Sequence, residues 1–337
     1  MTDGPRLAIV VVNYNSGYRL EQGLDALRDH PPSCGYEVVV VDNASVDGSA
    51  NFLRTEPRAG VTLVSSPINL LFTGGVNLAF SQSRGEFFMI MNPDMVPNEG
   101  AFDAMVRHLD DDPALGAVAG YTMRPDGTYE KYVGRFPTPL EVFIGNYFGT
   151  RAKRGWLLRK FQYGLEAEDF SRAVEAPNPA GGCLMFRRGL VNGLPMGGEF
   201  GVFWSDADLA QNIRASGRRI MVFPDAPFIH DHNPESRRVH DEASLSLVLD
   251  YLVGCEAYFR RHGAPWDAWK TRLLFASGAA ASLFAKHLPK AIAGRESWGM
   301  WRARARVLTD FWYRRNRLLM ATQGQAKTGR DSNISVS

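Results

Sequence analysis

The tripeptide Asn92-Pro93-Asp94 places polar side chains where an enzyme often performs chemistry. It follows an apolar run, residues 87–91, that has the pattern of a buried strand. Ligands of parallel sheets bind beyond the carboxyl ends of the strands, and a carboxylate there suits Mg²⁺ or Mn²⁺ beside a diphosphate. The tripeptide is also a good turn, because Pro presets φ and Asn and Asp hydrogen-bond their own backbone. Taken alone, it leaves both interpretations open.

Three further polar loops come after apolar runs of the first half. Asn13, Tyr14 and Asn15 follow one run, and Asp42 follows the next. A carboxylate beside a tyrosine ring suits a pyrimidine base, whose imide N–H can donate to it. The third loop ends in a glycine pair, residues 74–75, that would open a helix and let backbone N–H groups approach an anion. Glycine pairs at helix starts are common, so this loop is weak evidence alone.

The elements that must position these loops alternate regularly along the chain. Apolar runs predict strands, and the segments between them have helical spacing of leucines and other apolar residues. The predicted strands cover residues 7–12, 37–41, 61–64, 87–91 and 114–119, and the predicted helices 18–29, 45–53, 74–83 and 99–109. This alternation predicts an α/β fold with a mainly parallel sheet covered on both faces. Neither a G-x-G-x-x-G after the first strand nor a Walker motif occurs, which disfavours dinucleotide cofactors and ATP hydrolysis.

Composition places the chain among ordinary globular proteins. It has 337 residues, of which 45% are hydrophobic and 22% charged, enough for a large core. Its three cysteines form no metal or disulfide pattern, so we expect a reducing, cytoplasmic compartment. We expect no signal peptide and no membrane-spanning helix, because no apolar run approaches the required length of about 20 residues.

Charge is concentrated near the C-terminus. From Lys270 onward 13 Lys and Arg face three acidic residues, a net charge of +10 within a total of +2, so the preceding residues carry −8. Tryptophans and arginines interleave over residues 298–317, which suits a helix on an anionic membrane surface. A solvated or self-packing helix is the alternative, and nucleic acid is disfavoured because no recognised motif accompanies the charge. The basic run 151–160 could touch a lipid phosphate or be solvated.

Taken together, these motifs resemble those of family 2 glycosyltransferases, and most of all their rhamnosyltransferase-type subgroup. The resemblance covers about residues 6–265 and implies a GT-A fold, a nucleotide-sugar donor and a divalent metal. The motifs are Ile9 to Asn15, Val41 to Ser49, Asn69 to Asn77, Asn92 to Asp94, Ala180 to Arg188, Phe203 to Leu209, His230, and Tyr258 to His262.

The resemblance also implies roles for individual residues. Asp42 would contact the pyrimidine base, and Asp94 would ligate Mg²⁺ or Mn²⁺ with His230. His232 is a rival for that second ligand, and the alternative for His230 is a place in a turn over residues 230–234. The residues expected at the nucleotide-sugar are Asn13, Tyr14, Asn15, Asp42, Asn43, Asn69, Phe72, Gly75, Asn77 and Asn92.

Asp206 is the expected general base, since an inverting transfer needs a carboxylate to take the proton of the acceptor hydroxyl. Asp208 is the second carboxylate of the motif and the next candidate. Ser205 stands where the family usually has Glu, and Ser205 with Asp208 could equally form a capping box that begins a helix. Leu71 is a second departure, at a position where the family usually has Gly.

These observations predict an inverting, metal-dependent transferase that moves rhamnose or a related hexose from a dTDP- or UDP-sugar to a lipid-linked or glycan acceptor. The expected location is the cytoplasm, peripherally on the inner membrane face. Transfer of galactofuranose or N-acetylhexosamine on the same fold, or a non-catalytic nucleotide-sugar-binding scaffold, are the alternatives. The expected domains are a GT-A domain over 1–265 with a nucleotide-sugar half (6–120) and an acceptor half (121–265), a basic helical extension (266–320) and a disordered tail (321–337).

Overall fold

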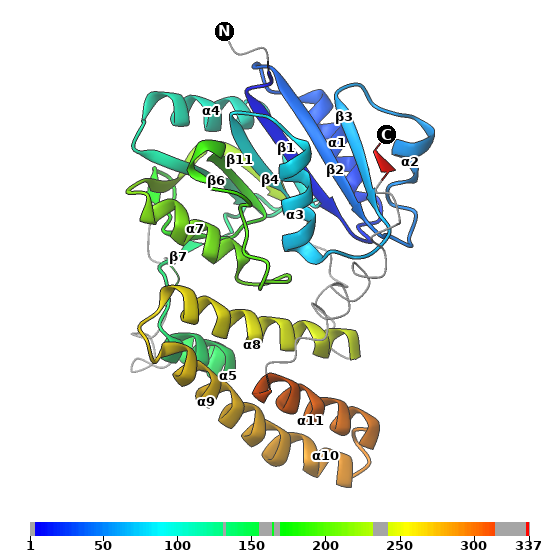
Figure 1. The fold of residues 1–337 in the computed structure, drawn as a ribbon, viewed down its shortest axis with the longest axis vertical. Coiled ribbons are helices and arrows are strands. Elements are labelled where there is room, and N and C mark those ends of the chain that lie inside the picture. The colour runs from blue at the N-terminus through cyan, green and yellow to red at the C-terminus, as the bar shows by residue number, and fades with distance from the viewer. Residues whose placement is uncertain are drawn as a thin grey trace.

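The computed structural model describes residues 4–130, 133–154, 164, 169–231, 242–313 and 335–336. An α/β part forms one end of the molecule and a group of helices the other (Figure 1). The expectations for His232, for residues 155–160 of the basic run and for the tail lie outside the described residues, apart from Ser335 and Val336. In the described part no helix is long and apolar enough to cross a membrane.

A ten-stranded sheet organises the α/β part. It has the order β12-β3-β2-β1-β4-β10-β6-β11-β5, with β8 paired to β11. Its main strands are β1 (Leu7–Asn13), β2 (Tyr36–Asn43), β3 (Val61–Ser66), β4 (Phe87–Met91), β6 (Leu115–Met123), β10 (Cys183–Arg187) and β11 (Arg219–His230). Its short strands are β5 (Met95–Pro97), β8 (Val174–Glu175) and β12 (Ser335–Val336), and a separate pair consists of β7 (Val133–Gly134) and β9 (Asn178–Pro179).

The predicted α/β fold is confirmed, with one of its main strands reversed, as are the short strands β5, β8 and β12. β3, β2, β1 and β4 are parallel, and β6 and β11 are parallel to each other. β10 lies between β4 and β6 and is antiparallel to both. The chain therefore enters β10 at the edge where the parallel strands end, so the residues before β10 lie at the same edge as the polar loops that follow those strands.

Helices cover both faces of the sheet because its central strands are apolar on both sides. Residues 7, 9 and 11 of β1 belong to one core and residues 8 and 10 to the other, as the twofold alternation of a strand requires. The first core contains residues of α1 (Arg19–Asp29), α2 (Asn51–Thr55) and α4 (Ala101–Asp111). The second contains residues of α3 (Leu71–Gln82) and α7 (Ser205–Ala215), and a short 3-10 turn, η1 (Arg188–Leu190), follows β10.

The remaining helices form a helical body beneath the sheet, with a third apolar core. Arg272 of this body donates from Nε to Glu256 Oε2 at 3.0 Å, which joins α8 to α9 across the predicted domain boundary at residue 265. The body consists of α5 (Pro139–Arg154), α8 (Glu242–His262), α9 (Asp267–Ser282), the π-helical segment η3 (Leu283–His287), α10 (Leu288–Ile292) and α11 (Trp298–Trp312).

The start of α3 differs from the prediction for a physical reason. The helix begins at Leu71, three residues before the predicted start, and Leu71 has φ +59°. That left-handed conformation is unfavourable for a residue with a Cβ, which explains why Gly would be easier at this position. Gly75 consequently lies within the helix and faces β1, where an added Cβ would stand 2.6 Å from Val12 Cγ1.

We predict that Gly75→Ala lowers the free energy of unfolding by about 1–3 kcal/mol, because the added methyl overpacks the contact with Val12. The loss should shrink in a Val12→Ala background, which removes the clashing methyls. Urea denaturation of the four proteins measures the coupling. Gly299→Ala in α11 is the control, since a Cβ there meets no atom closer than 3.7 Å. Equal losses in both backgrounds would contradict a packing role.

Candidate active site

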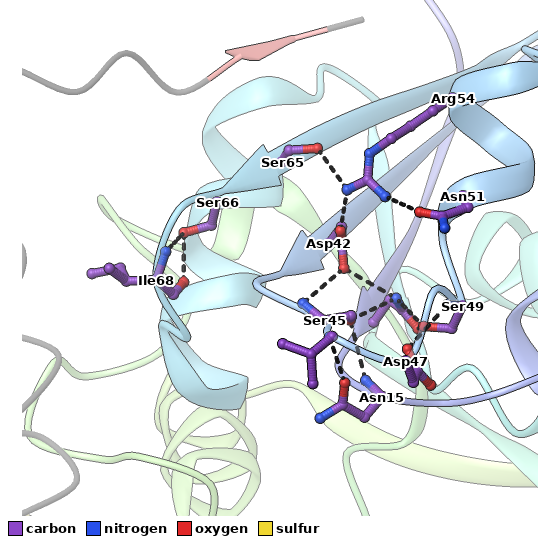
Figure 2. A network of polar contacts seen from close by, with 12 residues as sticks. Asn15, Asp42, Ser45, Asp47, Ser49, Asn51, Arg54, Ser65, Ser66 and Ile68 are labelled. Carbon is purple, nitrogen blue, oxygen red and sulfur yellow. Dashed lines mark hydrogen bonds and ion pairs between the residues drawn. The ribbon is translucent and has the colours of Figure 1, made fainter.

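The ends of β1 and β2 bring the first two predicted loops together. Asn13 and Asp42 are register partners in adjacent parallel strands, and both are buried. Asn13 donates from Nδ2 to Asp42 Oδ1 at 3.2 Å and to Ser49 Oγ at 2.9 Å. Figure 2 shows the resulting network of polar contacts around Asp42. The first two polar loops thus meet at one edge of the sheet.

The second oxygen of Asp42 is occupied by an arginine. Arg54 Nη2 donates to Asp42 Oδ2, while its Nη1 donates to Asn51 Oδ1 at 3.0 Å (Figure 2). The Arg54 side chain is 42% exposed, whereas that of Asp42 is 3% exposed. A ligand at this carboxylate oxygen would have to displace Arg54, which is the more exposed partner.

Tyr14 and Asn15 have different environments in the first loop. The Tyr14 ring is half exposed and available for stacking. Asn15 holds the loop in shape: it has φ +51°, and its Oδ1 accepts from Val46 N at 2.9 Å. Asparagine tolerates this left-handed conformation better than most residues.

The two asparagines of the next pair of loops hold each other. Asn43 Nδ2 donates to Asn69 Oδ1 at 2.9 Å, and Asn43 Oδ1 accepts from Leu70 N at 2.7 Å. Asn69 Oδ1 also accepts from Leu71 N at 2.8 Å. These bonds compensate the strained backbone at Leu71 and fix the start of α3, so in this conformation both side chains serve the loop itself.

Two other predicted donor residues also make protein contacts. Asn77 bonds both backbone atoms of Met196, donating to its carbonyl at 2.9 Å and accepting from its N–H at 3.2 Å. Phe72 is partly buried against the core that α3 and α7 share. Asn77, Phe72 and Gly75, which faces Val12, therefore hold α3 in place. The sequence predicted that these residues contact the sugar donor.

Asp94 and His230 do come together. His230 Nε2 lies 3.3 Å from Asp94 Oδ2, and its Nδ1 lies 2.8 Å from Glu130 Oε2. The two segments are held by β5 and β11, whose register pairs Met95 with His230. Burial acts to lower the pKa of His230, but the adjacent Asp94 and Glu130 carboxylates outweigh it and the pKa is raised.

Gly181 and Gly182, immediately before β10, contact both the Asn92 turn and Asp206. Gly182 accepts from Asn92 N at 2.8 Å, and an added Cβ would stand 2.7 Å from Asn92 Nδ2. Gly181 N donates to Asp206 Oδ2 at 3.2 Å. Consecutive glycines therefore contact the metal-motif turn on one side and the predicted base on the other.

The comparisons with known proteins agree with this arrangement. A family model described as glycosyl transferase family 2 matches residues 8–194. The chain belongs to this family. An N-acetylglucosaminyl-diphospho-decaprenol L-rhamnosyltransferase of Mycobacterium tuberculosis is 26% identical over 242 residues, which are 66% of this chain and 75% of that protein.

Solved structures show the same fold. A mannosyltransferase from Pyrobaculum calidifontis, in complex with GDP-Man and Mn²⁺, has 21% identity and a TM-score of 0.50 over 98% of this chain and 89% of that one. GalNAc-T7 with UDP, GalNAc and Mn²⁺ has 12% identity and a TM-score of 0.55 over 98% of this chain and 58% of that one. The predicted GT-A fold is thus confirmed, and the protein is a family 2 glycosyltransferase similar to rhamnosyltransferases.

The two aspartates of α7 are not brought together in this glycosyltransferase. Asp206 faces Gly181, and burial raises its pKa against the opposing effect of the backbone N–H groups of Ala207 and Gly181. Asp208 is fully buried, and its Oδ1 accepts from His262 Nε2 at 2.6 Å and pairs with Arg261 Nε at 3.2 Å. Asp208 therefore joins α7 to α8, and its role among the catalytic groups stays a prediction.

The alternative capping box at this helix is not formed. Among the described residues the Ser205 hydroxyl is buried without a hydrogen-bond partner, and α7 begins after Trp204 in a left-handed conformation, φ +71°. Ser205 therefore neither caps the helix nor replaces the carboxylate of a Glu.

The side chains of Asp94 and His230 fit a divalent ion. Asp94 Oδ1 is buried and has no hydrogen-bond partner among the described residues, so this oxygen has a vacant coordination direction. Asp94 and His230 supply one carboxylate and one imidazole, and the described part of the chain has no group of three or more His, Cys, Asp or Glu side chains arranged to hold a metal ion. Two protein ligands fit an ion that takes its other ligands from phosphate oxygens.

A cavity of about 240 Å³ adjoins this pair. Its walls come from the ends of β4, β6, β10 and β11 and from the β7–β9 pair. The lining includes Asn92, Met95, Thr122, Glu130, Cys183 and His230. The cavity thus places mainly apolar surface beside the predicted metal site.

Glu130 is the site residue that sequence reasoning missed. It is almost completely buried, it contacts His230, and its Oε1 pairs with Arg124 Nε at 3.0 Å. A hairpin around Pro125-Asp126-Gly127 returns the chain so that Glu130 N bonds Thr122 O at 2.8 Å. The Pro-Asp-Gly turn can be seen in the sequence. The contact between Glu130 and a histidine 100 positions later cannot.

We predict that Glu130→Gln lowers the affinity of the protein for Mn²⁺ about 10–100-fold, because a carboxylate behind a histidine orients the imidazole and raises its basicity. Electron paramagnetic resonance of free Mn²⁺, measured without nucleotide, gives this affinity. Glu175→Gln is the control, since Glu175 pairs with Arg214 away from the site. Unchanged Mn²⁺ affinity in Glu130→Gln would refute the orienting role.

Proposed function

We propose that this family 2 glycosyltransferase moves rhamnose or a related hexose, with inversion, from a dTDP- or UDP-sugar to a lipid-linked or glycan acceptor at the cytoplasmic membrane face. The observation that carries the proposal is the pair Gly181–Gly182, which contacts Asp206 with one residue and the Asn92 turn with the next. The rhamnosyltransferase relative, whose name includes a diphospho-decaprenol, supports the sugar and the lipid-linked acceptor.

Asp206 is the base in this proposal. In its ionised form the carboxylate takes the proton of the acceptor hydroxyl as the hydroxyl oxygen bonds the anomeric carbon. The bond from that carbon to the nucleoside diphosphate breaks in the same displacement, and the anomeric configuration inverts. Gly181 N–H and Ala207 N–H orient the two carboxylate oxygens, at 3.2 and 2.8 Å.

Asp94 and His230 would hold the divalent ion. The solved relatives with this fold contain Mn²⁺ together with a nucleotide or nucleotide-sugar. When bound, the ion supplies positive charge that offsets the charge developing on the departing diphosphate. Asn92, whose backbone is tied to Gly182, holds the turn that presents Asp94.

The nucleotide would lie at the ends of β1 and β2. The exposed Tyr14 ring offers a stacking face, and Asp42 offers an acceptor for the imide N–H of uracil or thymine once Arg54 moves aside. Galactofuranose and N-acetylhexosamine remain as rival sugars. A panel of nucleotide-sugars assayed for nucleotide release with Mn²⁺ or Mg²⁺ distinguishes the donors, and turnover of one rival alone would replace rhamnose in the proposal.

We expect Asp206→Asn to lower kcat by about 10²–10⁴-fold, the range for loss of a general base. The affinity for the donor should stay within about twofold, because Asn keeps the shape and one hydrogen-bond acceptor. Steady-state kinetics with the preferred donor, together with calorimetric titration of that donor, checks both values. Full turnover in Asp206→Asn would disprove the assignment of the base.

The raised pKa of Asp206 gives a pH dependence. The base must be ionised, so kcat/KM should fall as the pH is lowered through the raised pKa. The acidic limb should therefore lie above the ordinary aspartate pKa of about 3.9. Profiles are measured between the limits of protein stability, with unfolding followed in parallel. An acidic limb that coincides with loss of folded protein, or that lies at the ordinary value, would contradict this prediction.

A further inference from the structure

A groove of about 460 Å³ lies in the helical body, within the usual size range of small-molecule sites. It is bordered by α5, α8, α9, η3 and α11, together with Phe203 from the loop that precedes α7. The other lining residues are Asn146, Tyr147, Leu245, Leu247, Val248, Tyr251, Leu252, Phe275, Ala279, Ser282, Leu283, His287, Arg304 and Val307. The lining is thus predominantly aliphatic and aromatic.

The polar groups of the aromatic wall bond one another and leave apolar surface for the groove. Asn146 Nδ2 donates to Tyr251 Oη at 3.0 Å, and Tyr147 Oη donates to the Phe275 carbonyl at 3.2 Å. Burial raises the pKa of Tyr147 to about 12.

The groove borders the loop that precedes α7. Phe203, one of its lining residues, packs edge-on against Tyr251 with ring centroids 5.5 Å apart, and it precedes Asp206 by three residues. Two charged groups of the lining are paired, since Glu296 contacts both His287, at 2.8 Å, and Arg304, at 2.9 Å. The groove therefore has apolar surface close in the chain to the proposed base.

Several apolar residues of the groove face solvent in the described structure. Phe203, Leu247 and Val248 are 37%, 40% and 38% exposed. Large residues of this kind are usually covered, and a contiguous exposed apolar surface marks a binding site.

We propose that this groove binds the polyprenyl chain of a lipid-linked acceptor. The choice of acceptor rests on the proposed function; the choice of groove rests on its lining and its position. An acceptor must present its hydroxyl at Asp206, so an apolar chain attached to the same molecule can leave the site past Phe203. A peptide is a poorer occupant, because its backbone N–H and C=O groups would need partners, and the polar groups of Asn146, Tyr147 and Tyr251 already bond one another or a carbonyl.

The test uses a polyprenyl diphosphate with a diazirine at the end remote from the diphosphate. After photolysis with the full-length protein, mass spectrometry should locate the label on α8 residues 245–252 or on residues 275–287. An excess of unlabelled polyprenyl diphosphate should abolish the label, and phosphatidylglycerol at the same concentration should not. Equal competition by the phospholipid would overturn the proposal in favour of a general lipid surface.

Val248→Arg places a charge in the groove at a partly exposed position that tolerates it. We expect at least tenfold less labelling in this variant. Ile292→Arg is the matched control, since Ile292 is 69% exposed in α10 and does not line the groove. Label distributed over the exposed aromatic residues of the helical body, or equal loss in both variants, would overturn the proposal. So would absence of label in the wild-type protein, the result expected if another segment of the chain fills the groove.

Labelling needs neither donor nor turnover, so it separates the groove from the proposed function. Label in the groove without transfer to any acceptor would refute the proposed reaction and leave the groove standing. Transfer with the same KM for long-chain and short-chain acceptors, in wild type and in Val248→Arg, would refute the groove and leave the reaction standing.

Discussion

The two residues immediately before β10 have no space for side chains. A Cβ on Gly181 would stand 2.7 Å from Asp206 Cβ, and one on Gly182 equally close to Asn92 Nδ2. These approaches exist because β10 runs against β4 and β6, so that its first residues arrive at the edge where the other strands end. Replacing either glycine would push apart the two halves of the proposed site, whereas the rest of the sheet needs only apolar side chains of suitable size.

At the ends of β1 and β2, hydrogen bonds keep a buried carboxylate stable before any ligand binds. Asp42 has hydrogen bonds from Asn13, Ser45 and Arg54, since an unpaired buried charge would be strongly unfavourable. Arg54 is the exposed member of this group, so it can be replaced at a modest energetic cost. These hydrogen bonds are thus present before the nucleotide binds. In the proposed mode of binding, the base replaces Arg54 as a hydrogen-bond partner of Asp42.

Local sequence predicted the elements and the sheet edge well, because buried parallel strands are continuous apolar runs. The adjacency of Asn13 and Asp42 followed from the parallel arrangement alone. Contacts between distant segments could not be predicted in this way. Glu130 meets His230, and Asp208 meets His262, through packing of segments 100 and 54 residues apart. The left-handed backbone of Leu71 was likewise invisible, although its departure from the family's glycine marked the position.

The contact of Asp208 with Arg261 and His262 has a mechanical consequence. Pulling α7 away from α8 would leave a fully buried carboxylate unpaired, at a cost of roughly 3–5 kcal/mol. The contact therefore opposes separation of the helix that carries Asp206 from the helix that lines the groove. A conformational change that admits substrates would cost less in the backbone outside this joint than within it.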